Sequence, residues 1–131
     1  DVDLTAEDMA NHHLILWGDF SSNQMMKRIR EDLPLKWTND EVQIGSKSFS
    51  SASHVPILIY PNPLNPKKYI VINSGFTYRE YAYLNNARQV PMLPDWAIVD
   101  VVNAPDANDS IYRFPGIPVD ANFFNEAWQV K

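Results

Sequence analysis

Apolar residues occur in short runs along this chain, separated by polar segments rich in turn-forming residues. The run His12–Trp17 is apolar after its two histidines and ends at Gly18, as expected for a strand buried on both faces. Ser21 then opens a stretch in which hydrophobic residues recur at helical spacing as far as Leu33, and Pro34 ends it. Strand, glycine turn and amphipathic helix together predict the first unit of a Rossmann-like α/β fold.

Three other stretches carry signals for the start of a helix. Thr5 begins a capping-box pattern, which predicts a helix over Leu4–Asn11. The same pattern predicts a helix over Thr77–Asn86. Asp120 is expected to cap a short last helix. That helix carries four apolar or aromatic side chains: Phe123, Phe124, Ala127 and Trp128.

The remaining apolar runs predict strands. Glu41–Phe49 is read as an exposed strand or as a hairpin that turns at Gly45. Val55–Tyr60 and Lys68–Asn73 are rich in β-branched residues, and the proline-rich connection between them is too short for a helical crossover. These two runs are therefore expected to pair antiparallel. Trp96–Val102 predicts a further buried strand.

The order of these elements predicts a three-layer, Rossmann-like α/β sandwich with a mixed, mainly parallel sheet. The strand that ends at Trp17 and the strand that begins at Trp96 are expected to be central and parallel. Helices over Ser21–Leu33 and Thr77–Asn86 are expected to cover the sheet. We expect residues 1–131 to form one domain, and the abrupt polar start without a signal peptide indicates either a mature form or a piece of a longer protein.

Composition narrows the classes of function. The chain has 131 residues, of which 45% are hydrophobic, so it can bury a core without disulfides or metals. Its net charge of -5 disfavours a nucleic-acid partner. No apolar run reaches the roughly 20 residues that cross a bilayer, so the chain is not expected to span a membrane. The absence of cysteine excludes disulfides, thiol catalysis and Cys-ligated zinc.

The strongest candidate for a ligand site is the loop in which the first strand passes into a helix. A helix start attracts anions, and the loop offers four polar side chains: Asp19, Ser21, Ser22 and Asn23. Against this interpretation, the loop has one glycine where dinucleotide motifs have three, and it lacks Gly-Lys-Ser/Thr. Capping and closure of the loop are the alternative use of these residues.

A second candidate lies where a later strand ends, at Asn73 and Ser74. A serine after a buried strand resembles a nucleophile elbow, but that motif needs a glycine where Ile72 stands. His12 and His13 are adjacent, so on a strand they point to opposite faces and do not share a metal ion. We therefore predict no catalytic residue, no metal site and no cofactor in this chain.

Several strings in the chain are similar to one known domain. It is the C-terminal accessory domain of large exported bacterial α/β-hydrolases of the prolyl oligopeptidase or esterase-like kind, from Bacteroidetes and Planctomycetes. The strings that carry the resemblance are His13–Gly18, Ser22-Asn23, Leu33–Leu35, Leu58–Pro66, Tyr69–Gly75, Tyr78–Asp95 and Phe123–Trp128. The resemblance implies an exported host, with its catalytic serine in an upstream domain.

Three functional hypotheses follow. The first is a non-catalytic accessory domain that packs against a catalytic domain of the same or a neighbouring chain. The second is a module that binds carbohydrate or cell envelope through exposed aromatic side chains. The third is a small-ligand enzyme with its site at the loop Gly18–Asn23. Under the first two hypotheses, the polar residues at strand ends hold turns and helix starts together, and they do not meet to perform a reaction.

Overall fold

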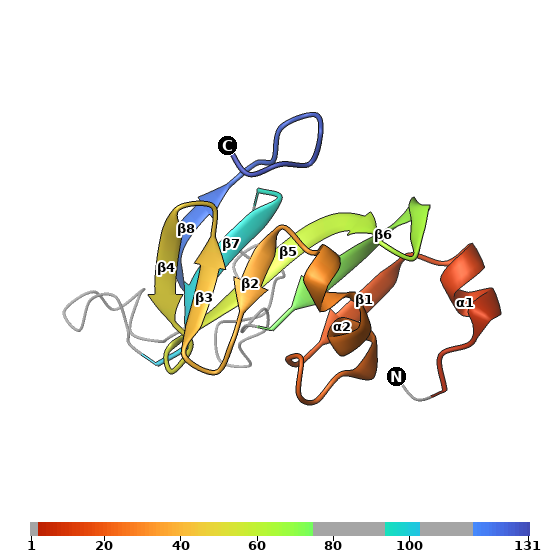
Figure 1. Ribbon diagram of the computed structural model, residues 1–131, viewed down its shortest axis with the longest axis horizontal. Coiled ribbons are helices and arrows are strands. Elements are labelled where there is room, and N and C mark those ends of the chain that lie inside the picture. The colour runs from red at the N-terminus through yellow and green to blue at the C-terminus, as the bar shows by residue number, and fades with distance from the viewer. Residues whose placement is uncertain (1–2, 75–93, 103–116) are drawn as a thin grey trace, which may run out of the picture.

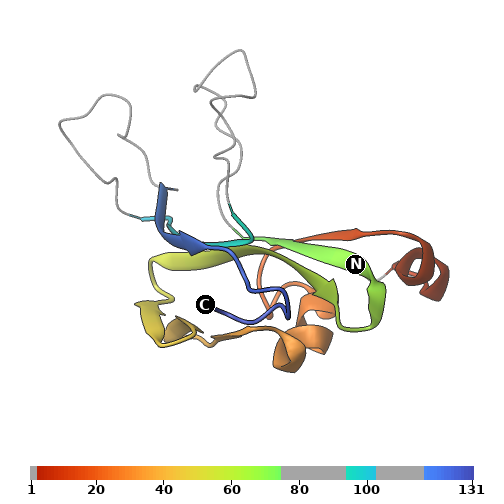
Figure 2. The same ribbon diagram turned by 90° about the horizontal axis from the view of Figure 1, so that it is seen from above.

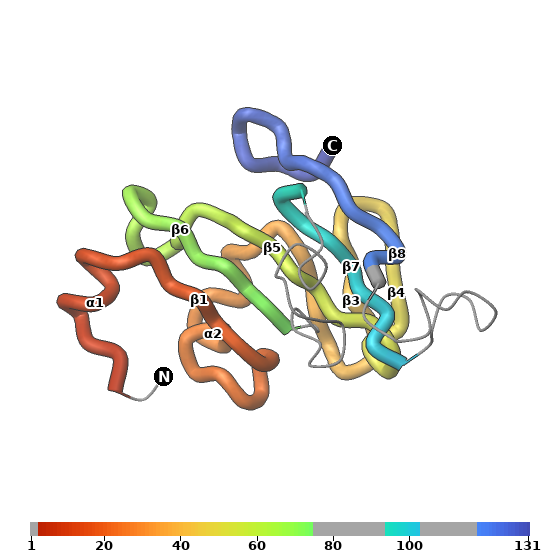
Figure 3. The backbone as a smooth tube through the Cα atoms, turned by 180° about the vertical axis from the view of Figure 1, so that it is seen from behind, coloured from red at the N-terminus to blue at the C-terminus, as the bar shows by residue number. Residues whose placement is uncertain are grey.

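Strands dominate the computed structural model, which describes residues 3–74, 94–102 and 117–131 (Figure 1). Within these residues, a five-stranded mixed sheet has the order β1-β6-β5-β7-β8. Its strands are β1 (Leu14–Trp17), β5 (His54–Asn62), β6 (Asn65–Asn73), β7 (Trp96–Asp100) and β8 (Ile117–Asn122). Figure 3 shows the same order of strands from behind.

A second, antiparallel sheet of three strands has the order β2-β3-β4. Its strands are β2 (Leu35–Trp37), β3 (Glu41–Ile44) and β4 (Lys47–Ser50), and the hairpin between β3 and β4 turns at Gly45, which has φ 57°. The described helices are short: α1 (Ala6–Asn11), α2 (Gln24–Ile29) and the 3-10 turn η1 (Arg30–Asp32). None of them is long and apolar enough to cross a membrane.

One face of the five-stranded sheet is covered by α2, by the three-stranded sheet and by the C-terminal segment (Figure 2). We call this the inner face. A single apolar cluster fills the space between the layers, and residues of every one of these elements contribute to it. Its fully buried members include Met26, Ile29, Val42, Ile70 and Ile98. On the opposite, outer face, a smaller buried group contains Ile57, Ala97 and Val99.

The predicted three-layer Rossmann-like fold is wrong, because the described part is mostly strands and its second layer is a sheet. The sheet is mixed as expected, but the pairing of β1 with β6 is its one parallel pairing among the described residues. The predicted antiparallel pair of Val55–Tyr60 with Lys68–Asn73 is confirmed. The short connection between β5 and β6 makes a hairpin, and a hairpin excludes the helical crossover that parallel neighbours require.

The placement of the first strand also differs from expectation. β1 is an edge strand and not a central one, and β7 pairs antiparallel with β5 and lies away from β1. Nor is β1 buried on both faces: Leu14 and Leu16 face the core, whereas Ile15 is 62% and Trp17 is 58% exposed. A run of four apolar residues looks the same in a buried strand and in a strand with one open face, which is why the sequence misled.

Two helix predictions need correction, and one lies outside the described residues. The second helix begins after Asn23, two residues beyond the predicted cap Ser21, and it ends at Ile29. Asp120 caps no helix, because it lies within β8, and Phe124 forms an isolated bridge with Val130. The helix expected over 77–86 falls in the part that the structure does not describe. At α1 the predicted capping box is present.

Candidate functional site

The loop between β1 and α2 is closed by the carboxylate of Asp19. Its Oδ1 accepts hydrogen bonds from the N–H groups of Ser21 and Ser22, both at 2.8 Å. The same oxygen accepts from the hydroxyls of Ser21 at 2.7 Å and Ser22 at 2.9 Å. These bonds, the one from the Ser21 hydroxyl first, favour the ionised carboxylate and lower the pKa of Asp19 to about 2. The carboxylate of Asp19 therefore stabilises this turn, because one of its oxygens accepts several hydrogen bonds from the turn.

Asn23 joins the end of β1 to the start of α2. Its Oδ1 accepts from the N–H of Met26, which caps the helix, and its Nδ2 donates to the carbonyl of Trp17, both at 3.0 Å. The side chain is buried, and both ends of its amide are used. Asn23 thus holds strand and helix together, and both polar atoms of its side chain bond to the backbone.

Ser74 and Asn73 lie beside this loop, because β6 runs parallel to β1. Asn73 is the register partner of Trp17, and the hydroxyl of Ser74 donates to the carbonyl of Gly18 at 2.5 Å. The structure therefore brings all six sequence-predicted ligand residues to one end of the parallel pair. The hydrogen bonds given above for the loop residues and for Ser74 are made to neighbouring protein atoms, so they close turns and begin the helix.

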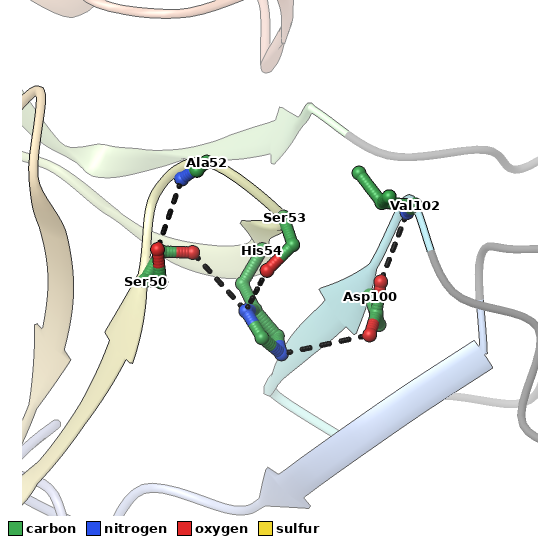
Figure 4. Close-up of polar contacts among 6 residues, drawn as sticks. All are labelled: Ser50, Ala52, Ser53, His54, Asp100 and Val102. Carbon is green, nitrogen blue, oxygen red and sulfur yellow. Dashed lines mark hydrogen bonds and ion pairs between the residues drawn. The ribbon is translucent and has the colours of Figure 1, made fainter.

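A second polar cluster, which we call the His54 cluster, lies where β4 turns into β5 (Figure 4). His54 Nδ1 is 3.0 Å from the hydroxyl oxygen of Ser53 and 3.1 Å from the carbonyl oxygen of Ser50. His54 Nε2 is 3.9 Å from Asp100 Oδ2 on β7. Asp100 Oδ1 also accepts from the N–H of Val102 at 2.9 Å. The cluster thus ties the turn before β5 to the end of β7.

The His54 cluster contains serine, histidine and aspartate, so it must be compared with a catalytic triad. A triad needs hydrogen bonds from the histidine to both partners, and 3.9 Å between Nε2 and Asp100 is too long for one. The carbonyl of Ser50 only accepts, so it bonds to Nδ1 when that nitrogen carries a proton, and a protonated Nδ1 does not take the proton of Ser53. We interpret the cluster as a tether between two strands.

Surface hollows border the β1–α2 loop and the strands β1 and β2. One, of about 570 Å³, lies beside η1 and β2; another, of about 420 Å³, is lined by Asp19 and Ser21 of the loop. Both are lined by Phe20, Trp37 and Thr38, and the rings of Phe20 and Trp37 contact each other with centroids 5.3 Å apart. A third hollow, of about 400 Å³, is lined by all four residues of β1.

Sequence reasoning missed both the His54 cluster and the contact of Phe20 with Trp37. The His54 cluster depends on the pairing of β5 with β7, whereas the contact of Phe20 with Trp37 depends on how the loop after β1 packs against β2. The antiparallel register of β5 with β7 places His54 opposite Asp100, so a correct strand pairing was the missing signal. Among the described residues, no group of three or more His, Asp or Glu side chains is arranged to hold a metal ion.

Comparison of the chain with protein-family models, with curated proteins and with solved structures finds no match.

Proposed function

We propose that this chain is a non-catalytic interaction domain, which packs against a catalytic domain of the same or a neighbouring chain. The observation that carries the proposal is the exposure of Ile15 and Trp17 on the outer face of the edge strand β1. Alternate residues of a strand point to one face, so these two side chains form a single apolar surface, which we call the β1 surface.

The β1 surface has two features of a docking site. Trp17, 58% exposed, is a large aromatic side chain of the type enriched at the energetic centres of interfaces. The open edge of β1 lies beside it, since β1 pairs only with β6 among the described residues. An edge strand presents unpaired backbone groups, and an exposed apolar edge that is left uncovered favours aggregation. A partner that covers the β1 surface would bury Trp17 and protect the open edge of β1.

The nature of the partner is supported by the resemblance to accessory domains of exported hydrolases. In that arrangement the host supplies the nucleophile, and this chain supplies none. The candidate polar residues agree with a non-catalytic role, since Asp19 and Asn23 are engaged in the loop and His54 is too far from Asp100 for a triad. The net charge of -5 favours a protein partner over a nucleic acid.

The test is a calorimetric titration of this chain with the purified catalytic domain encoded in the same or the adjacent gene. We expect saturable binding that weakens at least about tenfold, or about 1.4 kcal/mol, when Ile15 and Trp17 are both changed to aspartate. Because both side chains are largely exposed, the variant should keep the wild-type circular dichroism spectrum. Val119→Asp is the matched control, because Val119 is 50% exposed on the opposite edge strand β8.

Three results would contradict the proposal. Equal binding by wild type and the double variant would remove the β1 surface from the interface. Turnover of ester or aminoacyl substrates by this chain alone, retained in His54→Ala and Ser74→Ala, would reveal catalysis. A dimer of this chain that the double variant dissolves would replace the catalytic partner by a second copy.

A further inference from the structure

The hollows beside η1 and beside the Asp19 loop meet at the contact between Phe20 and Trp37, and we call them together the aromatic groove. We propose that the aromatic groove binds a neutral carbohydrate chain. The two hollows, about 570 Å³ and about 420 Å³, fall within the range of about 300–1,000 Å³ that is typical of small-molecule sites.

The centre of the groove is aromatic. Phe20 and Trp37 pack against the main core on one side, and their rings meet at an angle of 58°. Their remaining surface lines both hollows. The C–H groups on one face of a sugar ring pack on the electron-rich face of an aromatic ring, so this pair can hold a sugar at the point where the hollows meet.

The rim of the groove offers amide side chains that make no hydrogen bond within the described part of the chain. Asn39 and Gln43 line the two hollows, one each, and neither side chain makes a hydrogen bond with the described residues. An amide both donates and accepts, as does a sugar hydroxyl, so the two kinds of group are complementary. This pattern differs from that of the Asp19 loop, whose polar groups bond to one another.

The charges of the groove indicate a neutral ligand. Its lining contains Asp19 and Glu31 as acidic residues and Arg30 and Lys36 as basic ones. Arg30 Nε and Glu31 Oε1 also form an ion pair at 2.6 Å. Balanced charges give no net attraction for an anion or a cation, whereas a polyhydroxylated chain can bond to groups of both signs.

The aromatic rings of the groove and the side chains of the β1 surface belong to different faces of the five-stranded sheet. Phe20 and Trp37 pack against the inner core, while Ile15 and Trp17 point away from it. The carbohydrate proposal is therefore independent of the docking proposal, and each tryptophan provides the control for the other.

The test is affinity electrophoresis of the 131-residue chain in gels that contain a soluble polysaccharide. The probes are a mixed-linkage β-glucan, a xylan and a galactomannan, with anionic polygalacturonate for comparison. We expect retardation by at least one neutral polysaccharide and none by polygalacturonate. Trp37→Ala should weaken this binding roughly tenfold, whereas Trp17→Ala should leave it unchanged.

If Trp37→Ala does not fold, a second variant provides the test. It changes Asn39, which is exposed, and Gln43, which is half-buried. The variant Asn39→Ala/Gln43→Ala removes no hydrogen bond to the described residues, so it should fold like the wild type and bind at least severalfold more weakly. The proposal is overturned if no neutral polysaccharide retards the wild type, or if the variants of the groove bind as the wild type does. Stronger retardation by polygalacturonate would overturn the choice of a neutral ligand.

Discussion

At Asn23 one buried amide performs two structural tasks, because it caps α2 and holds the carbonyl that ends β1. Asp19 does the same for the loop, where its carboxylate gathers N–H and hydroxyl donors from two serines. Helix starts are also where proteins bind anions, so the same residue types serve both purposes. Only the hydrogen bonds distinguish the two uses, and here they are made within the loop.

The contribution of Asp19 to stability depends on pH. Its pKa is about 2 in the folded chain and 3.8 in the unfolded reference, so the stabilisation is fully present above pH 4 and is lost as the pH falls through 2. We expect Asp19→Asn to lower the free energy of unfolding at pH 7 by about 1 kcal/mol, a value reduced for solvent screening. Urea unfolding should show this difference shrinking between pH 4 and pH 2. A difference that is constant over this range would contradict the assigned role.

Among the elements, the connection from β1 to α2 depends on Gly18. Its φ is 97°, and a Cβ at this position would lie 2.6 Å from the hydroxyl oxygen of Ser22. That hydroxyl is held by Asp19, so it does not move away freely. The strand and the helix therefore meet at this angle only if the residue between them has no side chain.

Gly18→Ala should destabilise the chain by about 1–3 kcal/mol, because alanine is strained at this φ and its Cβ meets Ser22. The comparison is Gly45→Asn in the hairpin between β3 and β4, where φ is 57° and asparagine is tolerated better. Urea midpoints of the two variants measure the difference. A larger loss in Gly45→Asn than in Gly18→Ala would refute this explanation of the turn.

Local signals predicted several elements of this fold, whereas their pairing was not predictable. The capping box at Thr5, the turn at Gly45 and the hairpin of β5 with β6 depend on residues close in sequence, and the structure contains them. The position of β1 at the sheet edge depends on contacts with β6 and on which face the core covers. In the candidate site, the polar loop was located from the sequence, and capping and closure of the loop were one of its two expected uses, but the individual hydrogen bonds were not predictable.

At the scale of the whole molecule, one core joins two sheets, and the sheets differ in how well their strands are protected. β5 lies at the centre of the five-stranded sheet with β6 and β7 on its sides, whereas β1 and β8 are edges. Lys47 of β4 also reaches Asp120 of β8 at 2.7 Å, but Lys47 is largely exposed, so this ion pair adds little stability. Because the central strands are paired on both sides, we expect them to unfold last.

Hydrogen exchange measured by NMR or mass spectrometry should show this order. We expect the slowest exchange at buried positions of the central strands, such as Leu58, Ile70, Ile72 and Ile98, with rates that approach those of global unfolding. The backbone of β1 and β8 should exchange faster, because each strand has one open edge among the described residues. Equal protection of β1 and β5 would show that the edge of β1 is covered.

The parallel pairing of β1 with β6 has a consequence for biosynthesis. Leu14 pairs with Ile70, which is synthesised 56 residues later, so β1 leaves the ribosome long before its partner strand β6. At typical elongation rates of about 5–20 residues per second, this delay lasts several seconds. During that interval the nascent segment exposes Leu-Ile-Leu-Trp without a sheet to join, and we expect chaperones that bind extended apolar peptides to recognise it.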